Sequence, residues 1–181
     1  MKIARILTSS VIVSTLISFN ATAAVECAHQ VTSLISTNPV YSNLNSVLTP
    51  NLAQLKTKLD AVKDQASYVK LLTAVHTIAN SVVNGRLVIT LPDGTVIADT
   101  SKPDDPGNTK AQGNSFLHFK NKTINENLNT RISNLHSQLH VCGLGVETRF
   151  STTDNVEESF VAIRLGPYLD SSGTARISKK L

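Results

Sequence analysis

One predicted helical segment carries side chains that suit a ligand bearing a carboxylate. Asn127 and Arg131 are four residues apart, so they share one face of a helix. An amide can hydrogen-bond such a ligand, and a guanidinium offers the two parallel N–H groups that a carboxylate accepts. Ile124 and Leu128 fit a buried stripe, yet the segment also holds asparagines, which are poor helix formers. A ligand-binding face and a solvated polar face are both open interpretations.

Arg164 is a second candidate, because it is a charged residue in an otherwise apolar predicted strand. Alternation puts it on the face of Phe160 and Ala162. If that face is covered, the guanidinium needs an anionic partner such as a ligand carboxylate. If the face is open to water, it needs none. Tyr168 and Asp99 lie near strand ends and are expected at the rim of the same pocket. The predicted ligand-binding set is therefore Asn127, Arg131, Arg164, Tyr168 and Asp99.

A metal site and a catalytic site have less support. His136 and His140 are at i and i+4 and could share a zinc ion, with Cys142 or His118 as a third ligand. The His-Glu-x-x-His motif is missing, because residue 137 is a serine. No Gly-x-Ser-x-Gly motif occurs, and serine and histidine are too common here to identify a triad. We therefore expect a non-catalytic protein without a metal or another cofactor.

The chain has two cysteines, Cys27 and Cys142. In an oxidising compartment an even number of cysteines favours a disulfide. Such a bond would tie the mature N-terminus to the end of a later helix, and in the chain-entropy description it would stabilise the fold by roughly 4–5 kcal/mol. The alternative is two free thiols.

The first residues have the pattern of a cleavable secretory signal. Lys2 and Arg5 form a short positive start, and an uncharged run rich in Ile, Leu and Val extends to Phe19. Small residues follow, as a signal peptidase requires, and they permit cleavage after Ala23 or Ala24. We therefore expect a signal peptide over residues 1–23 and a periplasmic or secreted mature protein.

The mature chain is expected to be a single soluble domain over residues 24–181. The apolar run of the leader has about 14 residues, fewer than the roughly 20 that span a bilayer. Glu26, directly before Cys27, argues against a lipoprotein. The leader takes two of the 17 basic residues and none of the 13 acidic ones, which leaves a net charge of +2. This small charge, without basic clusters, argues against nucleic-acid binding.

Apolar spacing predicts three helices. A short helix over Val25–Thr37 is ended by Pro39, and a loop containing Tyr41 follows. A long helix begins at Thr49 and runs to Val82, about 50 Å at the usual rise. Its apolar stripe comprises Leu52, Leu55, Leu59, Val62, Ala66, Val69, Leu72, Val75, Ala79 and Val82. A helix of this length must lie along something extended or pair with another helix, which opens the possibility of a homodimer. The third helix is expected from about Thr123 to His140.

Alternating residues predict five strands. Arg86–Leu91 and Thr95–Asp99 form a hairpin around the turn at Pro92-Asp93-Gly94. The other three strands are expected at Leu144–Phe150, Ser159–Leu165 and Thr174–Ser178.

The segment Gly85–Thr100, which reads GRLVITLPDGTVIADT, resembles the opening hairpin of extracellular Cache domains, where a D-G-x-v-x-x-D-T pattern is common. Two strands, a helical excursion and three antiparallel strands are also the arrangement of a PAS-like sheet. The resemblance covers most of residues 50–178. It implies an α+β fold in which a long N-terminal helix packs on a PAS/Cache-like antiparallel sheet of about five strands.

The resemblance implies an exported domain that binds or senses a small molecule, often an amino acid or a carboxylate, between the sheet and its crossing helices. Such domains are usually fused to a membrane signalling protein. This chain departs from that pattern, so it would act as a free receptor or pass its state to a partner. The alternative function is a structural or partner-binding exported protein that dimerises through its long amphipathic helix.

Overall fold

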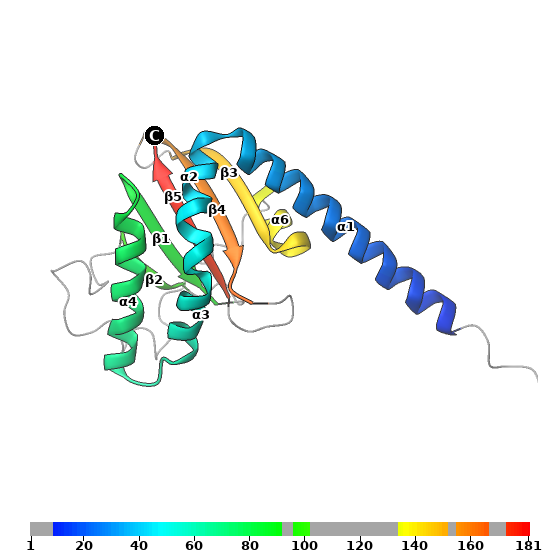
Figure 1. Ribbon diagram of the computed structural model, residues 1–181, viewed down its shortest axis with the longest axis horizontal. Coiled ribbons are helices and arrows are strands. Elements are labelled where there is room, and N and C mark those ends of the chain that lie inside the picture. Colours follow the sequence, from blue (N-terminus) through cyan, green and yellow to red (C-terminus); the bar gives the residue numbers. More distant parts are fainter. Residues whose placement is uncertain (1–8, 92–95, 102–133, 152–154, 167–172) are drawn as a thin grey trace, which may run out of the picture.

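A five-stranded antiparallel sheet forms the centre of the molecule. The structure is a computed structural model that describes residues 9–91, 96–101, 134–151, 155–166 and 173–181. The strand order is β2-β1-β5-β4-β3 (Figure 1). The strands are β1 (Gly85–Thr90), β2 (Val96–Asp99), β3 (Leu144–Ser151), β4 (Val156–Arg164) and β5 (Thr174–Lys180). The predicted α+β class and the five predicted strands are therefore confirmed, with small shifts at their ends.

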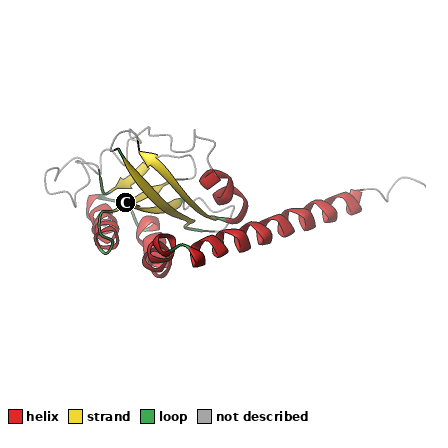
Figure 2. Ribbon diagram, turned by 90° about the horizontal axis from the view of Figure 1, so that it is seen from above, coloured by secondary structure: helices red, strands yellow, loops and turns green. Residues whose placement is uncertain are grey.

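Helices cover the sheet on both faces. They are α1 (Ser9–Thr37), α2 (Pro39–Leu48), a 3-10 turn (Thr49–Asn51), α3 (Leu52–Asp60), α4 (Gln65–Asn80) and α6 (Asn134–Cys142). Figure 2 shows α1 to α4 on one side of the strands and the short α6 on the other. The two faces of the sheet therefore have different partners.

The main core lies between the sheet and the layer of α1 to α4. Alternate strand residues such as Leu87, Val161 and Ile177 are fully buried there. Tyr68 of α4 reaches the sheet as well, because its hydroxyl donates to the carbonyl of Ile97 at 2.7 Å. Burial of this apolar face fixes the register of the strands, since a slip by one residue would turn each side chain to the opposite face.

The prediction of one long helix from Thr49 to Val82 is wrong. The helix is interrupted between α3, which ends at Asp60, and α4, which begins at Gln65. Asp64 begins α4 as its N-cap, and its carboxylate accepts a hydrogen bond from Ser67 N at 2.8 Å. Ser67 Oγ in turn accepts from Asp64 N at 3.1 Å, which completes a capping box. The break changes the buried face, so Val69 of the predicted stripe is 41% exposed whereas Leu71 is buried.

The loop predicted around Tyr41 is also wrong, because α2 occupies these residues. Pro39 ends one helix and begins the next. Asn38 caps α2 through its side-chain oxygen, which accepts from Val40 N at 2.9 Å, and Pro39 fits the first turn, where its missing N–H costs nothing.

The possible homodimer was expected to form through the apolar stripe of the long helix. Most of the apolar stripe assigned to it, including Leu55, Leu72 and Val75, is buried against the sheet of the same chain.

Helix α1 is longer than the predicted Val25–Thr37, since it begins at Ser9. Figure 1 shows its N-terminal half extending away from the sheet and the other helices. Among the described residues, no helix is both long and apolar enough to cross a membrane. Of the third predicted helix, the structure describes only the part from Asn134 onward, as α6.

Candidate ligand-binding site

The sheet face opposite α1 to α4 is rich in charged side chains. Arg176 on β5 lies between Val88 of β1 and Ala162 of β4 in the strand register. On the neighbouring strands, Phe160 lies opposite Ser178, and Arg149 lies opposite Glu158. Because side chains alternate along each strand, the polar members of this set share one face. We call this set, Arg86, Asp99, Arg149, Glu158, Phe160, Arg176 and Ser178, the arginine face.

Phe160 is the centre of the arginine face. Its ring is fully buried, and the guanidinium carbons of Arg149 and Arg176 lie 4.5 and 5.1 Å from the ring centroid. Both distances are in the range of cation–π contacts. Two guanidinium groups are thereby held beside one aromatic ring, although they repel each other. A negatively charged group placed between them would relieve this repulsion.

Arg176, also on the arginine face, has a strongly lowered pKa. Burial, together with the positive charges of Arg86 and Arg149, lowers the pKa of Arg176 to about 10, against the opposing effects of Glu158 and Asp99. Its Nε is shielded from solvent and has no hydrogen-bond partner within the described part of the chain. A buried cationic donor without an acceptor is costly, and a bound anion would supply the acceptor.

The two carboxylates of the arginine face already have partners. Glu158 is only 4% exposed, and Ser178 Oγ donates to it at 2.6 Å. Asp99 accepts from Arg86 Nε at 2.8 Å and from Arg86 Nη2 at 2.5 Å. Ser101 also donates to Asp99, through its N at 3.0 Å and its Oγ at 2.8 Å.

The pKa of Asp99 reflects two opposing effects. Burial raises the pKa, but hydrogen bonds and charge from Arg86, together with the Ser101 donors, lower it more, so the net pKa is below its usual value. Asp99 is therefore an ionised partner of Arg86 in this structure. This arrangement gives it a structural role at one edge of the arginine face.

The predicted ligand-binding residues are not brought together as one set. Asp99 lies at the β1–β2 side, paired with Arg86. Arg164 is at the far end of β4, where its backbone N donates to Gly143 O at 2.9 Å. Its guanidinium lies over Gly143, because a Cβ there would meet Arg164 Nε at 2.6 Å. Asn127, Arg131 and Tyr168 lie outside the described residues.

In the described part of the chain, no group of three or more His, Cys, Asp or Glu residues could hold a metal ion, so the zinc alternative gains no support there. Cys142 is held by Cys27 instead. His118 and the side chain of His136 lie outside the described residues.

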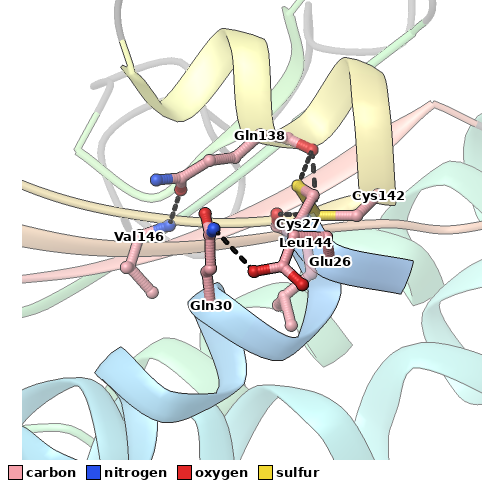
Figure 3. Close-up of a disulfide and its surroundings, with 7 residues drawn as sticks. All are labelled: Glu26, Cys27, Gln30, Gln138, Cys142, Leu144 and Val146. Carbon is pink, nitrogen blue, oxygen red and sulfur yellow. Dashed lines mark hydrogen bonds between the residues drawn. A yellow bond between two sulfur atoms is a disulfide. The ribbon is translucent and has the colours of Figure 1, made fainter. Parts of the chain in front are cut away.

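The predicted pairing of Cys27 with Cys142 is present, with the two Cα atoms 5.7 Å apart (Figure 3). It joins α1 to the last residue of α6. Figure 3 shows the carbonyl of Gln138 facing both sulfurs, with O···S distances of 3.8 and 3.3 Å. Since disulfide sulfurs carry no proton, these are close contacts and not donated hydrogen bonds.

Helix α6 lies over β3 and β4, at the Phe160 side of the arginine face. Its Leu135 packs with Phe160 and Ala162, and Leu139 packs beside them. Gly145 on β3 allows this close approach, because a Cβ there would meet Leu135 Cδ1 at 2.9 Å.

Sequence reasoning missed Arg86, Arg149, Phe160 and Arg176 as site residues. A weak signal was present for Arg176, since it alternates with the apolar Ala175 and Ile177 in a predicted strand. What brings it beside Phe160 is the pairing of β5 with β4, which no local pattern reveals.

Comparison with known proteins gives no further guide. The sequence matches no known protein-family model, and no curated protein is found as a relative.

Proposed function

We propose that this protein is an exported, non-catalytic domain of PAS/Cache type that binds or senses a small molecule on its arginine face. The order of two strands, a helix and three antiparallel strands supports the fold part of this proposal. The disulfide supports the export part, because such bonds persist in oxidising compartments. The domain would act in the periplasm or outside the cell and pass its state to a partner.

The observation that carries the binding proposal is the environment of Arg176. This side chain has a buried Nε without an acceptor among the described residues, and a second guanidinium, from Arg149, beside the same ring. Such an arrangement is unfavourable when empty and becomes favourable once an anion binds. Among the described residues, the two carboxylates of the arginine face are already held, Glu158 by Ser178 and Asp99 by Arg86.

A carboxylate is the anion that this chemistry fits best. Guanidinium groups form two parallel hydrogen bonds with a carboxylate, and Phe160 with Leu135 offers apolar surface next to them. The ligand class is therefore a small carboxylate, with amino acids included.

The binding proposal is tested with Arg176→Gln, which keeps a polar side chain but removes the charge. The wild-type protein is screened by thermal shift against small carboxylates and amino acids, and hits are measured by calorimetry. We expect at least one hit, and we expect Arg176→Gln to weaken it by tenfold or more, since charged hydrogen bonds contribute about 1.5–3 kcal/mol.

Lys58→Gln is the matched control, because it removes one positive charge on α3, which lies across the sheet from the arginine face (Figure 2). It should leave binding unchanged. A screen without any hit, in protein shown to be free of co-purified ligand, would contradict the proposal. Equal loss in both variants would indicate a general charge effect.

A further inference from the structure

Helix α6 is fixed near both of its ends. Near its start, Leu135 packs on Phe160. At its last residue, Cys142 is bonded to Cys27 of α1. Between them, Gln138 Oε1 accepts a hydrogen bond from Val146 N at 2.8 Å, and this contact is visible in Figure 3. The disulfide is the covalent link between α6 and α1, and the main chain joins the same end of α6 to β3 through Gly143.

A groove leads to this disulfide. Its volume is about 710 Å³, and Cys142 is part of its wall. Apolar residues of α1 line one side, including Ala24 and Ala28, and His140 and Arg164 lie on the other. A positively charged guanidinium near the sulfur would attract a thiolate, which is the attacking species in disulfide exchange. Cleavage of the leader after Ala23 or Ala24 would remove part of the α1 wall and widen this access.

We propose that the Cys27–Cys142 disulfide is a reducible latch that holds α6 on the arginine face. A dithiol reductant opens the latch, α6 loosens from Phe160, and the face loses affinity for its anionic ligand. The ligand part of this inference rests on the proposed function, whereas the movement of α6 does not.

The exchange reaction balances with one dithiol. A thiolate of the reductant attacks Cys142 Sγ from the groove, the bond to Cys27 breaks, and Cys27 leaves as a thiolate that takes up a proton. The second thiolate of the reductant then attacks the mixed disulfide and releases Cys142. The dithiol is oxidised to a disulfide, and the protein gains two thiols.

Amide exchange of Val146 tests the movement without any ligand. Its N–H is bound by Gln138 of α6, whereas the N–H of Ile177 belongs to the central strand. Exchange is followed by NMR in low urea concentrations, in the oxidised protein and after reduction with dithiothreitol. In the reduced protein we expect Val146 to exchange at least tenfold faster and independently of urea, which marks local opening. Ile177 should keep its dependence on urea, which marks global unfolding.

The arginine face is probed in the same samples with phenylglyoxal, which modifies accessible guanidinium groups. Mass spectrometry should show faster modification of Arg176 after reduction. In the double variant Cys27→Ser/Cys142→Ser, Arg176 should be modified as fast as in the reduced protein, and dithiothreitol should not change this rate. The control Gln138→Ala keeps the disulfide, so its arginine modification should stay slow.

The latch is overturned if Val146 and Ile177 show the same urea dependence after complete reduction, since α6 would then stay docked until the whole protein unfolds. Unchanged modification of Arg176 would also overturn it. The ligand part is tested separately, by calorimetry of a carboxylate hit with oxidised and reduced protein. Opening of α6 without any carboxylate hit would retain the latch and reject the proposed function.

Discussion

The pair of Arg86 and Asp99 shows how a charge is kept inside this sheet. Asp99 is 3% exposed, and it is ionised only because Arg86 contributes two hydrogen bonds and Ser101 two more. A buried carboxylate in this position is tolerated because each of its oxygens has a donor. Its partner Arg86 is one of the charges that lower the pKa of Arg176.

Asp99→Asn should destabilise the protein by about 2–3 kcal/mol at neutral pH. This figure is below the usual 3–5 kcal/mol for a broken buried pair, because Arg86 still reaches solvent. Since the folded pKa of Asp99 is lowered, its contribution is present above the ordinary value of about 3.9 and is lost as the pH falls through the folded pKa. The difference between wild type and variant should therefore shrink at pH 3. Urea unfolding at pH 7 and pH 3 measures it.

The control for this prediction is Asp60→Asn. Asp60 pairs with Lys56 on the exposed surface of α3, so its loss should cost less than about 0.5 kcal/mol. Equal losses of unfolding free energy in the two variants would show that the buried pair of Arg86 and Asp99 contributes no more than an exposed ion pair.

At the scale of elements, the strands were more predictable than the helices. The alternation of apolar and polar residues over Leu144–Phe150 identifies β3 whatever packs on it. A repeat of two residues is typical of a strand and does not fit a helix. The stripe from Leu52 to Val82 was misleading, since its spacing fits one helix although two are present. The missed signal is short and polar: Asp64 and Ser67 form a capping box inside the apolar pattern.

The candidate site was predictable only in part, for a physical reason. Of the predicted residues, Asp99 is part of the arginine face, and it lies in a hairpin that local alternation identifies. Arg164 is on the same side of the sheet but at the far end of β4. Arg149 and Arg176 reach Phe160 across two pairings whose registers depend on the whole sheet. Residues from separate strands therefore escape an analysis of local patterns.

The capping box predicts the effect of Ser67→Ala. The Ser67 hydroxyl accepts from Lys63 N and Asp64 N, both at 3.1 Å, and the substitution leaves these donors to water. We expect a loss of about 0.5–1 kcal/mol in the free energy of unfolding, measured by urea. Thr73→Ala, in the middle of the same helix, is the matched control. Its hydroxyl only bonds the Val69 carbonyl, so the change should be neutral or slightly stabilising. The reverse order of effects would refute the role of the box.

At the scale of the whole molecule, one bond joins elements that are far apart in the sequence. Cys27 and Cys142 are 115 residues apart, and they tie α1 to α6 across the edge of the sheet formed by β3. The same bond therefore connects the helix that contains the proposed cleavage site with the helix that packs on Phe160.

The proposed export predicts a defined mature end. Protein recovered from the periplasm or the medium should begin at Ala24 or Val25, as measured by intact mass and N-terminal sequencing. Replacing Ala23 and Ala24 with arginine should block processing at both predicted cuts, because the peptidase accepts only a small residue directly before its cut. An exported protein that still begins with Met1 would contradict the prediction.

The continuity of α1 has a consequence for the order of maturation. The proposed cut lies inside this helix, which runs from Ser9 to Thr37. A protease needs locally unfolded backbone, so the cut must come before the helix forms, or the helix must open again. Cys27 lies only a few residues beyond the cut, and once it is bonded to Cys142 this stretch is held against the rest of the protein. Leader removal is therefore expected first, helix formation second and oxidation of the cysteines last.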